Sequence, residues 1–220
     1  MADATRAHIT RLIAVPTVIT LAITILRLVG ELKHWPTPWF NTAAGGGFAV
    51  VGISWLPIVF GPYFALKLAA AGHKPASLGK AIGFAFLALL AYFVAGVLVA
   101  LTARHLSPLT LVAFSLLLFA AFVPLLGWSA LTRALLAYAL AARVPVLIVM
   151  YYAIGGNWGT HYDAMEPRLA QLSFGWKYFY AAIVPQLTAW IGWTVILGAI
   201  FGTVIAALVY RGKPAAPAAE

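Results

Sequence analysis

Two short patterns of histidine and carboxylate side chains are the strongest candidates for chemistry in this chain. Glu31 and His34 are three residues apart, a spacing that places both side chains on one helical face, as in helix-borne metal sites. His161 and Asp163 are two residues apart, so both side chains lie on one side of an extended segment. Imidazole and carboxylate groups suit zinc, iron or manganese. We therefore take Glu31, His34, His161 and Asp163 as candidate ligands of one divalent metal.

Four further polar or aromatic residues are candidates beside this site. His105 begins a short turn on the same predicted face of the membrane. Glu166 is a candidate general base or additional ligand, with a metal-activated water as the attacking group in a hydrolysis. Asn157 and Trp158 belong to the longest polar stretch of the chain, and long loops carry function more often than short turns.

The alternative for the same residues is a polar plug without a metal. Pro36 disfavours helix at the residue before it, so His34 lies at or beyond a helix end and the helical spacing to Glu31 is weakened. Glu31 can instead pair with Arg27, four residues earlier. His161 and Asp163 can form hydrogen bonds to the backbone of their own loop. No tight ligand motif decides between the two interpretations.

Arg143 is the one charged residue near the middle of an apolar stretch. It follows the start of the stretch 134–154 by nine residues, or about 13 Å of helix. A charge at this depth of a bilayer is costly, so the guanidinium must face the bundle interior, a water-filled cavity or a carboxylate. The functional interpretation is contact with an anion or another substrate. The alternative is a structural arginine that bonds carbonyls freed by Pro145 or extends along the helix.

Apolar stretches long enough to cross a membrane must position these residues. A hydrocarbon core of about 30 Å needs about 20 apolar residues per helix. Six stretches meet that length, at residues 12–30, 48–66, 81–103, 109–128, 134–154 and 185–209. The sequence therefore predicts one all-α domain over residues 1–220, a polytopic membrane protein of six transmembrane helices. The last helix could begin as early as Tyr178.

Two polar segments are longer than turns, residues 31–47 and 155–177. The first contains Pro36 and Pro38, which exclude regular helix, and three consecutive glycines that allow a tight return into the membrane. Trp35 and Trp39 are typical of aromatic residues at a membrane surface. Both segments are expected on the outer face.

The distribution of basic residues predicts the orientation. With the N-terminus inside, the inner segments hold eight Lys and Arg and the outer ones hold five. Basic residues collect on the cytoplasmic side, so both termini are expected in the cytoplasm. The only acidic residues away from the termini, Glu31, Asp163 and Glu166, then all lie on the outer side.

Composition limits the class of protein. The chain is 64% hydrophobic and 9% charged, whereas soluble domains carry about 25% charged residues. We therefore expect a multi-pass protein of the cell membrane, with the lipid bilayer as its main partner. The net charge of +9 fits cytoplasmic loops facing anionic lipid better than nucleic acid. Cysteine is absent, which excludes disulfides and thiolate chemistry.

Three functions remain open on these residues. The first is a permease-like protein that handles a small solute or ion, with Arg143 as its contact. The second is an outer-face membrane enzyme that uses a divalent metal. The third is a non-catalytic subunit or assembly partner of a membrane complex, or a homo-oligomer. Glycine pairs such as Gly198 and Gly202 indicate close helix packing in all three cases and favour none.

Overall fold

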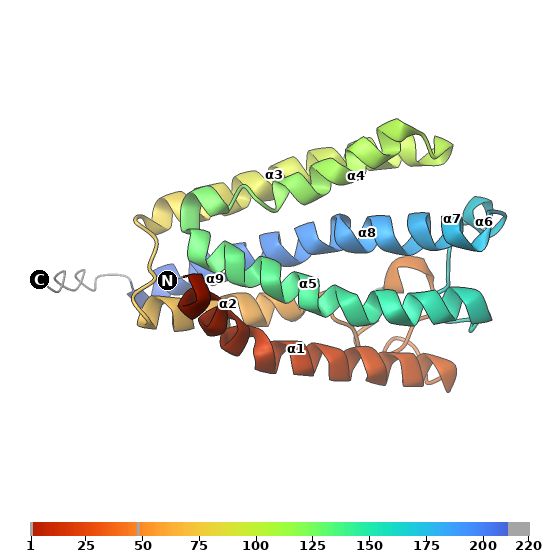
Figure 1. Cartoon of the computed structure of the whole chain (residues 1–220), viewed down its shortest axis with the longest axis horizontal. Helices are drawn as coiled ribbons and strands as arrows, with labels where there is room; N and C mark the ends of the chain where they lie inside the picture. The colour runs from red at the N-terminus through yellow and green to blue at the C-terminus, as the bar shows by residue number, and fades with distance from the viewer. Residues whose placement is uncertain (1, 48, 211–220) are drawn as a thin grey trace, which may run out of the picture.

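The computed structural model of this chain describes residues 2–47 and 49–210, with side chains from residue 9 onward. It is a bundle of helices that run along one common axis (Figure 1). Four helices are long and apolar enough to cross a membrane, namely Ile9–Leu32, Leu78–His105, Leu125–Gly156 and Phe174–Tyr210. The prediction of an all-α chain with several such helices is confirmed. The number of spans, the sidedness of the termini and the single domain stay predictions.

Two predicted spans contain helices shorter than expected. α2 (Leu56–Ala70) begins well after the predicted start at Phe48, which lies outside the described residues, and residues 49–55 are irregular. Pro57 lies in the first turn of α2, where a proline favours helix initiation. α4 (Pro108–Ala120) ends before the predicted Trp128 because Pro124 cannot donate to the carbonyl of Ala120. These helices are about 22 Å and 20 Å long, less than a hydrocarbon core.

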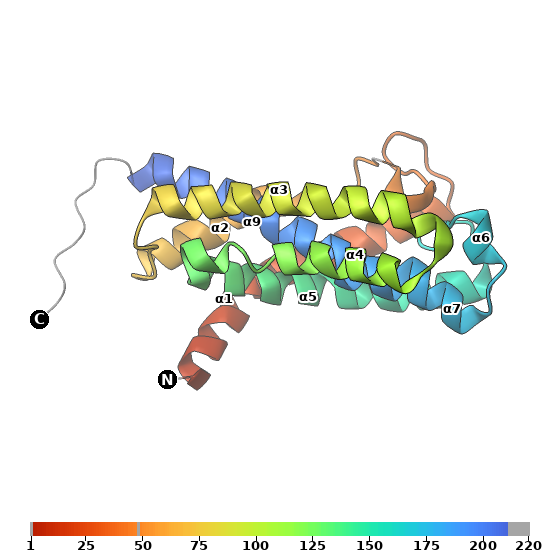
Figure 2. The same cartoon turned by 90° about the horizontal axis from the view of Figure 1, so that it is seen from above.

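The other helices match the predicted spans but are longer. α1 (Ala2–Leu32) and α3 (Leu78–Thr102) cover the first and third stretches, and the first turns of α1 project from the bundle (Figure 2). α5 (Leu125–Gly156) begins before the predicted residue 134, with a break at Trp128. Both ends of α5 are apolar, so the helix continues beyond the length that a bilayer requires.

The last long helix starts at Phe174, not at residue 185, and is interrupted in its first half. It contains α7 (Phe174–Tyr178), a π-helical turn η3 (Phe179–Ile183), α8 (Val184–Leu187) and α9 (Ala189–Tyr210). Pro185 lacks the N–H that would bond one turn back, and a π-turn accommodates this locally. Such turns in helices occur frequently at functional sites.

α9 is the central helix, and α2, α3 and α5 all pack against it. Glycine lets α2 and α9 approach closely: a Cβ on Gly61 would lie 2.2 Å from the carbonyl oxygen of Gly198, and one on Gly202 would lie 2.8 Å from that of Gly61. The Gly198 and Gly202 pair therefore acts within the chain. Beside it, Phe60, Phe64 and Tyr138 form an aromatic cluster with edge-to-face contacts.

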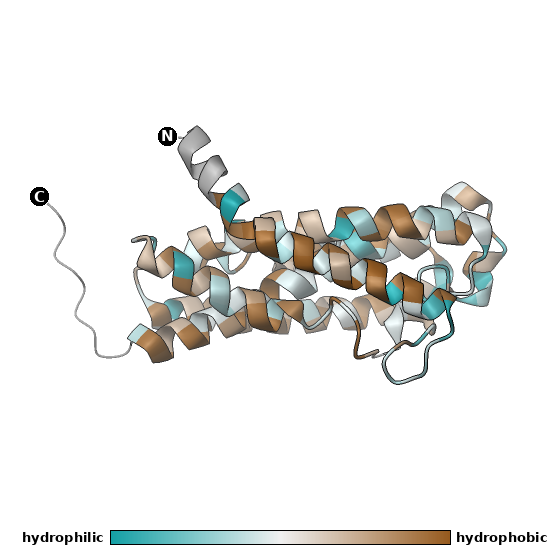
Figure 3. Ribbon diagram, turned by 90° about the horizontal axis from the view of Figure 1, so that it is seen from below, coloured by the Kyte–Doolittle hydropathy of each residue, from teal (hydrophilic) through white to brown (hydrophobic). Residues whose placement is uncertain are grey.

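The polar segments gather at one end of the bundle, which we call the loop end. It carries residues 33–47, the turn η2 (Ala103–His105), residues 157–166 and the short helix α6 (Pro167–Ala170), as Figures 1 and 2 show. The turns at 71–77 and 121–124 lie at the opposite end. Figure 3 shows hydrophobic residues along the helices and more hydrophilic ones in the loops. The two predicted polar segments thus share one end.

We expect Gly61→Ala to destabilise the fold, because its Cβ would collide with the α9 backbone. Overpacking of this kind costs about 1–3 kcal/mol. The midpoint of unfolding in mixed micelles of increasing dodecyl sulfate content measures the loss. Gly83→Ala on α3 is the matched control, because nothing lies within 4 Å of its Cβ position. Equal midpoints for the two variants would contradict the close α2–α9 crossing.

Candidate functional site

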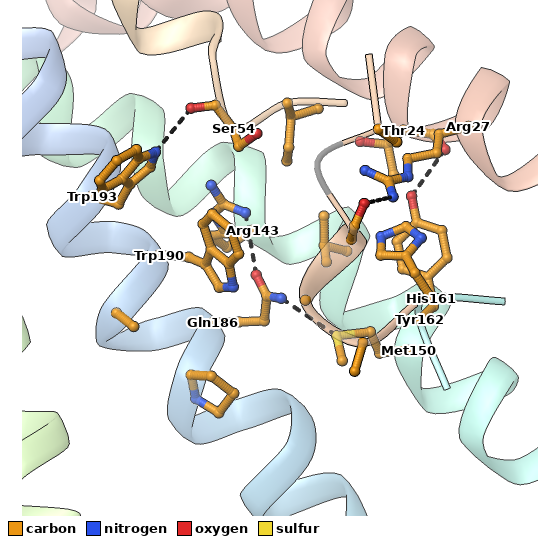
Figure 4. A pocket seen from close by; sticks show the side chains of 18 of the residues that line it. Thr24, Arg27, Ser54, Arg143, Met150, His161, Tyr162, Gln186, Trp190 and Trp193 are labelled. Carbon is orange, nitrogen blue, oxygen red and sulfur yellow. Dashed lines mark hydrogen bonds between the residues drawn. The ribbon is translucent and has the colours of Figure 1, made fainter. Parts of the chain in front are cut away.

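A cavity of about 750 Å³ lies among the helices beside the loop end (Figure 4). Its walls come from α1, α2, α3 and α5, from residues 44–47 and the irregular residues 49–55, and from the loop at 161–164 and the broken helix 174–210. Aromatic side chains form much of the lining: Trp55, Tyr92, Tyr162, Trp190 and Trp193. This volume and this mixture of aromatic walls with a few polar groups are typical of a small-molecule site.

Arg143, predicted as a substrate contact, lies in the wall of this cavity and is 3% exposed. It donates to the side chains of Gln186 at 3.3 Å and Thr194 at 3.1 Å. Its guanidinium carbon lies 5.2 Å from the ring centre of Trp190, a cation–π distance. Nε has no hydrogen-bond partner among the described residues. The carbonyl that Pro145 frees is not among its acceptors.

No carboxylate neutralises Arg143 within the described part of the chain. The ion pairs found there join Glu31 to Arg27, Glu31 to His161, and Glu166 to Arg168. Gln186, which accepts from Arg143, directs its own amide nitrogen to the sulfur of Met150 at 3.6 Å. A thioether is a weak acceptor. The cavity therefore presents a buried cation, and beside it an amide nitrogen whose acceptor is weak.

The second arginine in the cavity wall, Arg27, is in contrast paired with a carboxylate. Its Nε donates to Glu31 at 2.7 Å. One terminal nitrogen donates to the backbone oxygens of Asn41 at 3.0 Å and Gly46 at 2.8 Å. These bonds tie the end of α1 to the polar segment 31–47. Arg27 thus positions the loop that closes this side of the cavity.

Glu31 joins a third segment to the same point. Its side chain is fully buried, and Oε2 accepts from the backbone N–H of His161 at 2.8 Å. The His161 Nδ1 lies 2.7 Å and 2.8 Å from the two carboxylate oxygens. The ring of Tyr162 contacts that imidazole at 3.8 Å, and its hydroxyl donates to the backbone of Thr24. One carboxylate therefore connects α1, the segment 31–47 and the loop after α5.

Glycine at two positions makes room for Arg27. A Cβ on Gly46 would lie 3.2 Å from the guanidinium, and Gly46 has a φ of +89°, which favours glycine. A Cβ on Gly52 would lie 2.9 Å from the same group. The run of glycines that the sequence associates with a tight turn therefore also admits a charged side chain.

Irregular backbone forms part of the cavity wall, and several of its polar groups are paired. The N–H groups of Val50 and Val51 donate to the carbonyls of Pro38 and Trp39. The indole of Trp193 donates to the carbonyl of Ser54 at 3.0 Å and joins α9 to this segment. Non-helical backbone at membrane depth is tolerated where it lies within protein or lines a cavity.

Of the four predicted metal ligands, the structure brings together only Glu31 and His161. His34 is exposed at the end of α1 with a φ of +54°. Asp163 accepts from the backbone N–H groups of Gly159 and Thr160 and stabilises its own loop. Across the part of the chain that the structure describes, no three His, Asp or Glu side chains form a group that could hold an ion. The zinc, iron or manganese site stays a prediction.

The remaining candidates are apart from the cavity. His105 is exposed in η2, and Glu166 forms an exposed ion pair with Arg168, which also donates to the backbone of Ala103. Asn157 ends α5 with a left-handed conformation, and Trp158 is exposed beside it. These residues organise the loop end, and the lining of the cavity does not include them.

Sequence reasoning missed four residues that shape the site around Arg143 and Arg27. They are Gln186, Trp190, Thr194 and Tyr162. One signal could have found two of them: Gln186 and Thr194 are polar residues in an apolar stretch and are eight residues apart, close to two helical turns. The contact of His161 with Glu31 joins residues 130 positions apart and carries no local signal.

Comparisons with protein-family models, curated proteins and solved structures find no match for this chain. The functional argument therefore depends on the geometry of the cavity.

We expect Glu31→Gln to destabilise the protein strongly, because Arg27 would remain buried without its counter-charge. Breaking a buried pair in this way costs about 3–5 kcal/mol. Glu166→Gln is the matched control, since that pair is exposed and contributes at most about 1 kcal/mol. Unfolding midpoints in dodecyl sulfate mixtures compare the two. Similar losses would show that Glu31 does not anchor the loop end.

His161 should make stability depend on pH. Burial lowers the pKa of its imidazole and Arg27 acts in the same direction, whereas Glu31 and Asp163 raise it without reversing the shift. Tyr162 contacts the same ring. The unfolded chain then binds a proton near the ordinary pKa of about 6.5 before the folded chain does. Stability from this group is therefore present above that pH and is lost progressively as the pH falls below it.

His161→Asn keeps a donor for Glu31 but does not titrate, so its thermal midpoint should vary less with pH. His34→Asn, at an exposed site, is the control and should keep the slope of the unmodified protein. A slope that survives in His161→Asn would assign the pH dependence to other groups.

Proposed function

We propose that this chain is a permease-like protein of the cell membrane that binds a small anionic solute in the cavity beside Arg143. One observation carries the proposal: a buried guanidinium in a cavity wall lacks a carboxylate partner among the described residues and has an unpaired Nε. Charged residues within membrane helices usually mark a substrate or ion path.

The energetics of burial favour an anion as the occupant. An unpaired buried charge costs several kcal/mol, and neutral partners such as Gln186 and Thr194 offset only part of that cost. An anion that bonds to Nε would supply the missing charge and the missing acceptor together. The same cavity would disfavour a cation, because Arg143 lies in its wall without a counter-charge among the described residues.

Interrupted helices beside the cavity support a transport role over a static anion site. Residues 49–55 before α2 are irregular, and η3 with Pro185 interrupts the last helix at the cavity wall. In secondary transporters, discontinuous helices near the midplane form the substrate site and take part in the change of access. The two interruptions lie on different elements, as movement of one part against another requires.

The proposal includes six spans with both termini in the cytoplasm. α2 with residues 49–55, and α4 with the turn at 121–124, are each long enough to complete a crossing that the helix alone does not span. The loop end would then face outward. Arg211 and Lys213, which contribute to the count of inner basic residues, lie outside the described residues.

The enzyme and subunit alternatives have less support. Glu31 already accepts from Arg27 and His161, so the outer-face enzyme lacks a free carboxylate at that position. Exposed apolar side chains along α3, such as Phe93 and Val97, suit lipid as well as a protein partner. They favour neither a subunit nor a homo-oligomer.

We expect binding of an anion to change the fluorescence of Trp190, which lies against Arg143. Titration of the protein in zwitterionic nanodiscs with organic and inorganic anions should give a saturable change for at least one of them. Arg143→Gln should weaken that binding at least about tenfold, since a hydrogen bond to a charged group contributes about 1.5–3 kcal/mol. Uptake of the bound anion into proteoliposomes tests transport.

Arg133→Gln is the matched control on the same helix, exposed and outside the cavity lining, and should bind as the unmodified protein does. No saturable change with any anion, or equal affinity in Arg143→Gln, would overturn the proposal.

A further inference from the structure

We infer that the ligand of this cavity is an amphiphilic anion, with a carboxylate or phosphate head at Arg143 and an apolar body that extends between α2 and α3 toward the lipid. This inference rests on the proposed function and specifies its substrate class. It follows from the size of the cavity, the position of its one unneutralised charge and the depth of its exposed wall.

The volume excludes a bare inorganic ion as a well-fitted occupant. A water molecule takes about 30 Å³ of liquid, so about 750 Å³ holds many times the volume of a small anion. The rest of the cavity is lined largely by apolar and aromatic side chains, with Ile53, Ile58, Val146 and Leu197 among them. An apolar body filling that space would gain burial free energy in proportion to its length.

The polar groups that lack a charged partner are concentrated at one place. Arg143 offers its free Nε, and the amide nitrogen of Gln186 has only the Met150 sulfur as a partner. Arg27 already has the counter-charge of Glu31 and bonds to two backbone oxygens. The head group therefore belongs at Arg143 and Gln186. Trp190 holds the guanidinium against its ring, and Figure 4 shows these side chains together.

The apolar wall is exposed at membrane depth. Trp55 and Ile58 line the cavity and are 43% and 38% exposed. Ile58 precedes the end of α2 at Ala70 by twelve residues, about 18 Å of helix. On α3, Tyr92 follows the start at Leu78 by fourteen residues, about 21 Å. Both depths fall within a hydrocarbon core of about 30 Å, so this side of the cavity faces acyl chains.

A series of alkanoates tests the inference in nanodiscs of phosphatidylcholine. Trp fluorescence should report binding that tightens about tenfold for each two methylene groups from butanoate to octanoate. Octyl phosphate should bind, whereas octanol and octylammonium should bind at least about tenfold more weakly than octanoate. Arg143→Gln should lose the preference for octanoate over octanol, and Arg133→Gln should keep it.

A second measurement avoids reliance on Arg143 variants, which could fail to fold. The chain contains no cysteine, so Ser54→Cys places a single thiol in the cavity wall. Octanoate should slow its reaction with a maleimide, and acetate at the same concentration should not. Ser115→Cys on α4, outside the cavity lining, is the control and should react at the same rate with and without octanoate.

The outcomes separate the inference from the proposed function. Binding of acetate or inorganic phosphate as tight as that of octanoate would overturn the amphiphile and leave an anion permease. Failure of every anion to bind or protect would overturn both. Replacing part of the phosphatidylcholine with phosphatidylglycerol identifies the source: reduced octanoate binding supports a bilayer lipid as the natural occupant, and unchanged binding supports a free amphiphile.

Discussion

The buried carboxylate of Glu31 is the constraint on which the loop end depends. It accepts from Arg27 and from both the backbone and the ring of His161, and its side chain is fully buried. Arg27 in turn holds the carbonyls of Asn41 and Gly46. The end of α1, the segment that follows it and the distant loop after α5 are therefore held together through Glu31 and Arg27. Removal of that group would leave a buried arginine without a counter-charge, which costs more than the pair contributes.

The two arginines of the cavity wall illustrate two uses of a charge in an apolar environment. Arg27 is neutralised locally by Glu31 and bonds to backbone, so its charge organises structure. Arg143 is held in place by Gln186, Thr194 and Trp190, all of them neutral. These contacts orient the guanidinium without cancelling its field. A site prepared in this way is complementary to an anion before the anion arrives, which lowers the reorganisation that binding requires.

The sequence predicted the apolar helices and Arg143 because those signals are local. Length and hydropathy identify a membrane helix, and a charge in such a stretch stands out. The irregular residues 49–55 and the π-turn η3 were not predicted, because hydropathy does not distinguish helix from other backbone in an apolar stretch. The sequence is compatible with both a polar plug and a metal site around Glu31. Only the fold places His161 beside it, so spacing alone could not decide between them.

The breaks in the helices and the cavity have a common physical origin. Regular helices can pack closely, as Gly61 and Gly198 do on α2 and α9, and such contacts leave little empty space. Where residues 49–55 and η3 depart from helix, side chains no longer interlock, and the cavity lies between these two elements. Their backbone groups must then bond elsewhere, as Ser54 does with Trp193. The departures from helix at these two elements thus leave the space, and bonds such as that of Trp193 satisfy the irregular backbone beside it.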